Sequence, residues 1–235
     1  MPLPLDAPRS LRLESRDVPL ELRRHPRARR ITLRLSPGGD GVQMVLPRRT
    51  SVREAIDFAE RNGGWILKHL EKVPDRIPFV DGAVIPLLGE NHTIAHDPAG
   101  RSGVIREGGT IRVSGLAQHL PRRVGDFLKR EARTEISTRA RAKAAVIEER
   151  VGRISLRDTR SRWGSCSSSG DLNFSWRLIL APEPVLDYVV AHEVAHLAEL
   201  NHSRRFWKLA DRLTGDMAAA KTWLSRNSAE LWRYG

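Results

Sequence analysis

Residues 182–203 read PEPVLDYVVAHEVAHLAELNHS. The two prolines suit the first turn of a helix, and apolar residues follow at helical spacing, so we expect a helix from about Pro182 to Leu200. Its core-facing stripe consists of Leu186, Val189, Val190 and Leu197. The motif H-E-x-x-H occupies 192–196 in the same helix. We therefore expect the helix to bury its apolar stripe and to present the motif to a cleft.

The motif suits a catalytic metal ion. His192 and His196 lie four residues apart and project from the same helix face, so both imidazoles can reach one ion. Glu193 lies about 100° further round the helix. A carboxylate at this position of the motif acts as general base on metal-bound water. The sequence therefore predicts a hydrolase that uses a metal-activated water.

A third ligand is expected shortly after the helix. Catalytic zinc sites usually have three protein ligands and one open position, and His202 lies six residues beyond His196. We expect Asn201 to end the helix in a left-handed conformation and Ser203 to cap the next helix, which would place His202 at a tight bend. One Zn²⁺ per chain is the expected cofactor, although iron, cobalt and nickel also suit imidazole ligands. The alternative is that the three histidines lie together without a metal.

Hydrophobic periodicity in the rest of the chain indicates a mostly β first half and a mostly helical second half. We expect a hairpin over 31–46 with its turn at 37–41, a helix of roughly 15 to 20 residues capped by Ser51, short strands between 78 and 115, a long helix from Pro121, a hairpin over 160–176, and helices at 203–213 and 216–232. This order is typical of the α+β class. The expected parts are a tail or lead-in over 1–17, a β-rich subdomain over 18–117 and a helical domain over 118–235.

Composition narrows the cellular setting. At 235 residues, of which 40% are hydrophobic, the chain is long enough to bury a core without disulfides. Cys166 is the single cysteine, which fits a reducing compartment. The sequence contains neither an export signal nor a long apolar run, so we expect a cytoplasmic protein with no membrane partner.

The formal charge of +12 is concentrated in two basic clusters. The first contains Arg23, Arg24, Arg27, Arg29, Arg30 and Arg34. The second covers 121–162, with 13 Lys and Arg against 6 Asp and Glu. Positive surfaces of this kind attract polyanions, so nucleic acid or nucleotides are expected partners, and a merely solvated basic surface is the alternative.

Several motifs in fixed order resemble a known family. They are DTRSRWGSC at 158–166, LNFSWRL at 172–178, HEVAHL at 192–197, NHS at 201–203 and FW at 206–207, preceded by RRITLR at 29–34 and GWI at 64–66. Together they resemble the YgjP-like metallopeptidase family, which is related to SprT-like zinc proteases, over nearly the whole chain. The resemblance implies a zincin-like catalytic part over 118–235, zinc held by the three histidines, and Glu193 as the catalytic glutamate.

The function we expect is that of a zinc-dependent metallopeptidase that acts on a protein or peptide. Glu193 would take a proton from zinc-bound water, which attacks the carbonyl of a peptide bond. Arg162, Asn173 and Tyr188 are candidates for substrate contact, and structural roles are the alternative for each. The hairpin strand is also expected to lie along the cleft and to pair with an extended peptide.

Two other functions stay open at the level of sequence. A metal-dependent phosphohydrolase acting on nucleotides would bind phosphate through arginines such as Arg160 and Arg162. A nucleic-acid-binding module with a structural zinc is the second, although structural zinc sites usually have four ligands that include cysteine.

Overall fold

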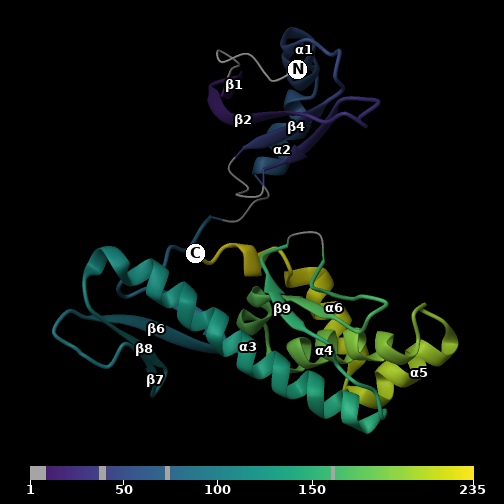
Figure 1. The fold of residues 1–235 in the computed structure, drawn as a ribbon. Helices are drawn as coiled ribbons and strands as arrows, with labels where there is room; N and C mark the ends of the chain where they lie inside the picture. Colours follow the sequence, from purple (N-terminus) through teal and green to yellow (C-terminus); the bar gives the residue numbers. More distant parts are fainter. Residues whose placement is uncertain (1–8, 37–40, 72–74, 160–161) are drawn as a thin grey trace. The chain divides into compact units, whose positions relative to one another are not determined.

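The chain divides into two compact units, and each has its own hydrophobic core. The computed structural model describes residues 9–36, 41–71, 75–159 and 162–235 (Figure 1). Unit 1 is Met1–Pro74 and unit 2 is Asp75–Gly235. None of the described helices combines the length and the hydrophobicity that a membrane span requires.

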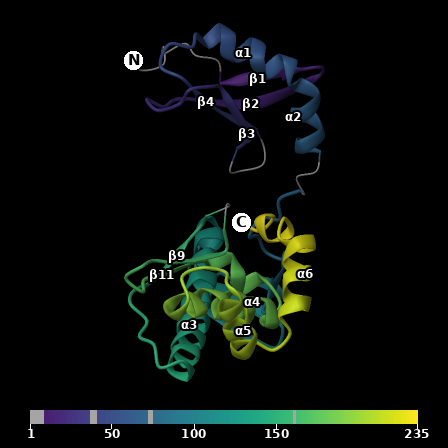
Figure 2. The ribbon, with the colours of Figure 1, turned by 90° about the vertical axis from the view of Figure 1, so that its right-hand side faces the viewer.

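Unit 1 is a four-stranded sheet covered by two helices (Figure 2). The strand order is β1-β2-β4-β3, and β3 pairs with β4 antiparallel, which confirms the expected hairpin; residues 37–40 of its turn lie outside the described residues. The bounds are β1 (Ser10–Leu13), β2 (Arg16–Arg24), β3 (Thr32–Leu35), β4 (Val42–Leu46), α1 (Val52–Arg61) and α2 (Gly63–Leu70).

Two expectations for unit 1 need correction. The expected lead-in over 1–17 contains strand β1, because Leu11 and Leu13 alternate with exposed residues and bury in the core of this unit. The single helix expected after Ser51 is instead two helices. Ser51 does cap the first of them, but Asn62 has a non-helical backbone (ψ 14°) and its side chain donates to the carbonyl of Phe58 at 2.7 Å.

Unit 2 begins with a second four-stranded sheet, of order β5-β6-β8-β7, which packs against the long helix α3. The strands are β5 (Val84–Leu87), β6 (Glu90–Asp97), β7 (Val104–Glu107) and β8 (Thr110–Ser114), followed by the 3-10 helix η1 (Ala117–His119) and α3 (Leu120–Val146). These strands and this helix confirm the expectation for 78–146. The expected boundary at 117–118 differs from the observed division, because α3 shares one core with this sheet.

A three-stranded sheet of order β10-β11-β9 follows α3. Its strands are β9 (Ile154–Arg157), β10 (Gly164–Cys166) and β11 (Leu172–Ser175). The expected hairpin is present, but its first strand begins at Gly164 rather than near 160, and residues 160–161 lie outside the described residues. The hairpin turns where Gly170 adopts a φ of +76°, a conformation that favours glycine.

The C-terminal helices follow the expected order. They are η2 (Trp176–Leu180), α4 (Glu183–Ala198), α5 (Arg204–Leu213), α6 (Met217–Asn227) and η3 (Glu230–Trp232). In Figure 1, α3 runs beside the β6–β8 sheet at one end and beside β9 and α4 at the other. The protein is therefore an α+β protein whose C-terminal part consists of a long helix, a small sheet, the H-E-x-x-H helix and two further helices.

Arg177 of η2, the short helix before α4, binds the backbone of the last residues of unit 2. Its guanidinium, 7% exposed, donates to Asp158 at 2.7 Å and to the carbonyls of Leu231 and Tyr234. It also lies against the indole ring of Trp176, 4.6 Å from the ring centroid. A planar side chain with several donors is needed to make these contacts at once.

We therefore predict that Arg177→Lys lowers the free energy of unfolding by about 2–3 kcal/mol, because lysine retains only part of this set of bonds. The matched control is Arg153→Lys, which alters an ion pair with Asp171 whose arginine is 78% exposed and should change stability by less than about 0.5 kcal/mol. Denaturant unfolding measures both. Equal losses for the two variants would contradict this role of Arg177.

Candidate metal centre

Helix α4 is buried on nearly all sides. Its buried residues are Val185, Leu186, Tyr188, Val189, Val190, Ala191, Glu193, Val194 and Ala195. Helix α3 covers it on one side, strand β10 on another, and α5 and α6 on the rest. A helix with apolar residues all round belongs in a core, so the polar residues of its second half need a specific reason to be there.

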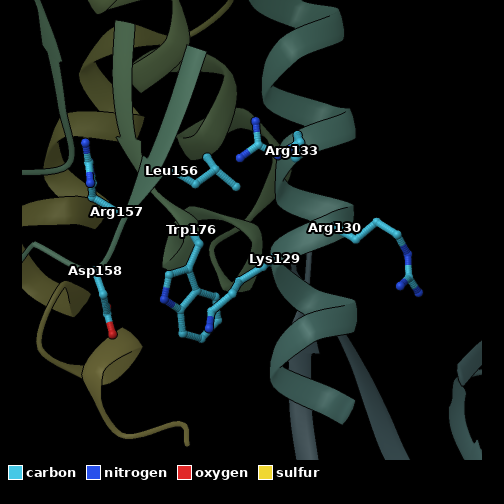
Figure 3. A pocket seen from close by; sticks show the side chains of 7 residues that line it. All are labelled: Lys129, Arg130, Arg133, Leu156, Arg157, Asp158 and Trp176. Atoms are coloured by element: carbon cyan, nitrogen blue, oxygen red, sulfur yellow. The ribbon is translucent and has the colours of Figure 1, made fainter. Parts of the chain in front are cut away.

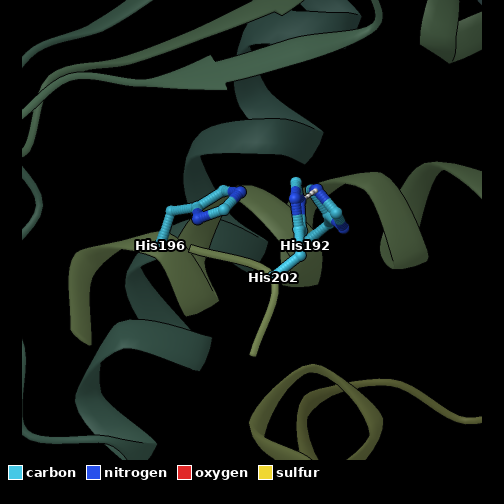
Figure 4. Close-up of side chains that lie close together, drawn as sticks. All are labelled: His192, His196 and His202. Carbon is cyan, nitrogen blue, oxygen red and sulfur yellow. Dashed lines mark hydrogen bonds between the residues drawn. The ribbon is translucent and has the colours of Figure 1, made fainter. Parts of the chain in front are cut away.

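Those polar residues meet a third histidine that comes from the following loop (Figure 4). His192 and His196 project from one side of α4, and His202 points toward them. One ligand nitrogen of each histidine lies within 4.8 Å of the others. The Nε2 atoms of His192 and His202 are 3.1 Å apart. Two ligands of a tetrahedral zinc ion lie about 3.4 Å apart, so the spacing of this pair suits a metal ion, and His196 is close enough to join them.

The loop between α4 and α5 aims His202 at the other two histidines. Helix α4 ends at Ala198, and Glu199 is extended (φ −129°, ψ 100°). Asn201 does not adopt the expected left-handed conformation; its side chain instead accepts a hydrogen bond from the backbone N–H of Ser203 at 3.1 Å. Ser203 caps α5 as expected. The bend therefore consists of the extended Glu199 and the turn in which the Asn201 side chain binds the N–H of Ser203.

The orientation and charge of the histidines suit metal binding. The Nδ1–H of His196 donates to the carbonyl of Glu199 at 3.0 Å, which leaves Nε2 with its lone pair. Burial, with a smaller contribution from the positive charges of His196, His202 and Lys221, lowers the pKa of His192 to about 4. His192 is therefore neutral near pH 7. The buried Nδ1 of His192 has no hydrogen-bond partner among the described residues.

Aromatic rings from α5 hold the histidines in place. Trp207 stacks on His202 with a centroid distance of 5.3 Å, and Phe206 lies 4.4 Å from the ring of His196. The amino group of Lys221 in α6 lies over the ring of Trp207, 3.6 Å from its centroid. The expectation from sequence included none of these supporting residues as part of the site, although FW at 206–207 was among its motifs.

Glu193 is buried beside the histidines. It is 6% exposed. Burial raises its pKa to about 7, while the positive charge of Arg162 opposes the shift. The carboxylate lies against Gly164 at the start of β10, where an added Cβ would lie 2.5 Å from Cγ of Glu193. Only glycine at this position leaves room for the carboxylate of Glu193. The sequence signal for this contact was the position of Gly164 in the motif RWGSC.

The three residues expected to contact substrate lie in two places. Arg162 and Asn173 line one pocket of about 250 Å³, which Gly164 also lines. Tyr188, 7% exposed, lies one turn before His192 with its ring 6.0 Å away, so it forms part of the wall behind that histidine. Cys166 keeps its proton, because burial raises the pKa of its thiol and the charges of Glu193 and Asp171 add to this.

Two histidines one turn apart, a buried glutamate between them and a third histidine after the helix define the H-E-x-x-H class of metallopeptidase-like proteins. The chain belongs to the YgjP-like family: the family described as "YgjP-like, metallopeptidase domain" matches residues 29–227. The family implies a metal ion and a peptide substrate.

Comparison with other proteins adds little beyond this family. No curated protein matches the chain. Among solved structures, the metallopeptidase zymogen of Pyrococcus abyssi abylysin is similar, with 20% identity and a TM-score of 0.32 over 46% of this chain and 96% of that one.

The contact between Gly164 and Glu193 predicts a double-mutant result. Gly164→Ala should lower the free energy of unfolding by about 1–3 kcal/mol, because the new methyl group overlaps the glutamate. In a Glu193→Ala background the same change should cost almost nothing. Gly215→Ala is the control, because no atom lies within 4 Å of its added Cβ. An undiminished cost of Gly164→Ala in that background would show that Glu193 is not the group displaced.

Proposed function

We propose that the protein is a zinc metallopeptidase, with one ion per chain held by His192, His196 and His202. The observation that carries the proposal is the meeting of three imidazoles whose ligand atoms lie within 4.8 Å of one another. Three neutral imidazoles are a typical ligand set for catalytic zinc, and three protein ligands leave one coordination position open. The single cysteine of the chain is not part of this cluster, which argues against a structural zinc site.

Zinc bound there would act as a Lewis acid that lowers the pKa of water and polarises a carbonyl. Glu193 is the proposed general base. Its carboxylate is buried, and its pKa of about 7 allows it both to take up and to release a proton near neutral pH. Gly164 keeps the space in which the carboxylate lies. Glu193 would then return the proton to the leaving amine.

Strand β10 is the proposed site of peptide binding. It is an edge strand of its sheet, since the order is β10-β11-β9, and it packs against α4. An extended peptide can add to such an edge by main-chain hydrogen bonds. Arg162 and Asn173 line the adjoining pocket and would contact substrate side chains. Tyr188 is buried behind His192 and would position that ring rather than touch the peptide.

A phosphohydrolase is the second candidate, because Arg162 lines the pocket next to Glu193. An arginine there would bind phosphate oxygens as readily as a peptide carboxylate. Arg160, the other arginine expected in this role, lies outside the described residues. Nucleic-acid binding by the first basic cluster and a cytoplasmic location stay predictions from the sequence.

We predict about one zinc ion per purified chain, and loss of most of it in His202→Ala, because two ligands hold the ion far less tightly than three. Metal analysis after dialysis against a weak chelator measures this. His25→Ala is the control, since His25 is exposed and outside the cluster. Full occupancy in His202→Ala would remove His202 from the ligand set.

Glu193→Gln should retain zinc and lose 10²–10⁴-fold in the rate of hydrolysis of labelled casein, because the amide cannot accept a proton. Glu149→Gln, an exposed glutamate, is the matched control. ATP is assayed in parallel. Unchanged casein cleavage in Glu193→Gln would contradict its role as base, and zinc-dependent release of phosphate from ATP without casein cleavage would favour the phosphohydrolase.

A further inference from the structure

A second hollow, of about 540 Å³, lies beside α3 at the β9 edge of the three-stranded sheet (Figure 3). Leu156 and Trp176 form its apolar wall. Its positive residues are Lys129, Arg130, Arg133 and Arg157. Figure 3 shows Lys129 and Arg133 on the side of α3 that faces Leu156 and Trp176, whereas Arg130 extends away from them.

The positive charge of this hollow has no ion-pair partner in the part of the chain that the structure describes. Among the described residues, no carboxylate lies within ion-pair distance of the four cations. Arg133 donates to the backbone carbonyl of Ile154, at 3.4 Å. Asp158 is the acidic residue of the lining, and its carboxylate accepts hydrogen bonds from Arg177 at 2.7 and 3.3 Å. The hollow is therefore an electropositive site with an apolar wall.

The sheet joins this hollow to the candidate metal centre. Gly164, which touches Glu193, pairs with Phe174 of β11, and Phe174 pairs with Leu156 of β9. Two strand spacings separate Gly164 from Leu156, which is about 10 Å. Arg157 lines both the hollow and the pocket of Arg162 and Asn173.

We propose that the hollow is an exosite for protein substrates, at the sheet edge opposite β10, and that it takes acidic side chains flanked by apolar ones. This inference rests on the proposed peptidase function. Acidic groups would pair with Lys129, Arg133 and Arg157, and a neighbouring apolar side chain would pack on Leu156 and Trp176. A peptide is favoured over nucleic acid because Arg157 lines both this hollow and the pocket that Gly164, the neighbour of Glu193, also lines.

Equilibrium binding tests the proposal without turnover. The probe is a short fluorescein-labelled peptide that contains Leu-Glu-Glu-Phe, compared with the same peptide carrying Gln in place of Glu, and the protein is the full chain with Glu193→Gln. The pocket variant is Lys129→Glu with Arg133→Glu, two residues that lie four apart on one face of α3. The control, Arg141→Glu with Arg150→Glu, makes the same charge change at exposed residues outside the hollow.

We expect the acidic peptide to bind more tightly than its Gln counterpart, and the pocket variant to weaken acidic-peptide binding at least about tenfold. The control variant should stay within about twofold. If the charge reversal prevents folding, Lys129→Gln with Arg133→Gln replaces it and should give a smaller loss in the same direction.

Equal binding of the two peptides, or equal effects of the pocket and control variants, would overturn the proposal. A labelled oligothymidylate measured alongside tests nucleic acid: loss of its binding in the pocket variant, with no binding of the acidic peptide, would also overturn it. Failure of casein hydrolysis contradicts the proposed function but leaves a positive binding result intact, so the two failures are distinguishable.

Discussion

The burial of α4 is the constraint on which the rest of unit 2 depends. This helix is surrounded by α3, β10, α5 and α6, yet its second half contains two histidines and a glutamate. Polar groups in such a position are costly unless each has a partner or a function. The surrounding elements therefore serve two purposes at once. They exclude water from Glu193, and they leave one side of His192 and His196 open toward His202.

The position of α4 along α3 is held by charges at its other end. Arg139 of α3 pairs with Glu183 at 2.9 Å, and Lys143 pairs with Asp187 at 2.9 Å. Lys143 also donates to the carbonyl of Leu213 at the end of α5. The two contacts of Lys143 are partly buried, so they are weakly screened and help to set the register of three helices. The histidines are thus placed by rigid helices, while the loop supplies only His202.

Much of this arrangement was predictable because it depends on local spacing. The H-E-x-x-H motif lies on a helix whose start was marked by prolines, and Ser203 caps α5 by hydrogen bonds within a few residues. The prediction that Asn201 adopts a left-handed conformation was wrong. Its side chain accepts a hydrogen bond from the backbone N–H of Ser203, and this forms the bend instead. The break at Asn62 was also missed; there the side chain and the backbone N–H of Asn62 both donate to the carbonyl of Phe58, which ends the first helix.

Residue order alone therefore established the α+β class, the metal-ligand candidates and the family of this protein, because each rests on local spacing or on the order of motifs along the chain. The folded chain established the contacts between elements distant in sequence. Gly164 makes room for Glu193, Trp207 and Lys221 support His202, and the sheet connects Leu156 to the metal centre. Such contacts depend on how helices and strands pack, which no local pattern encodes.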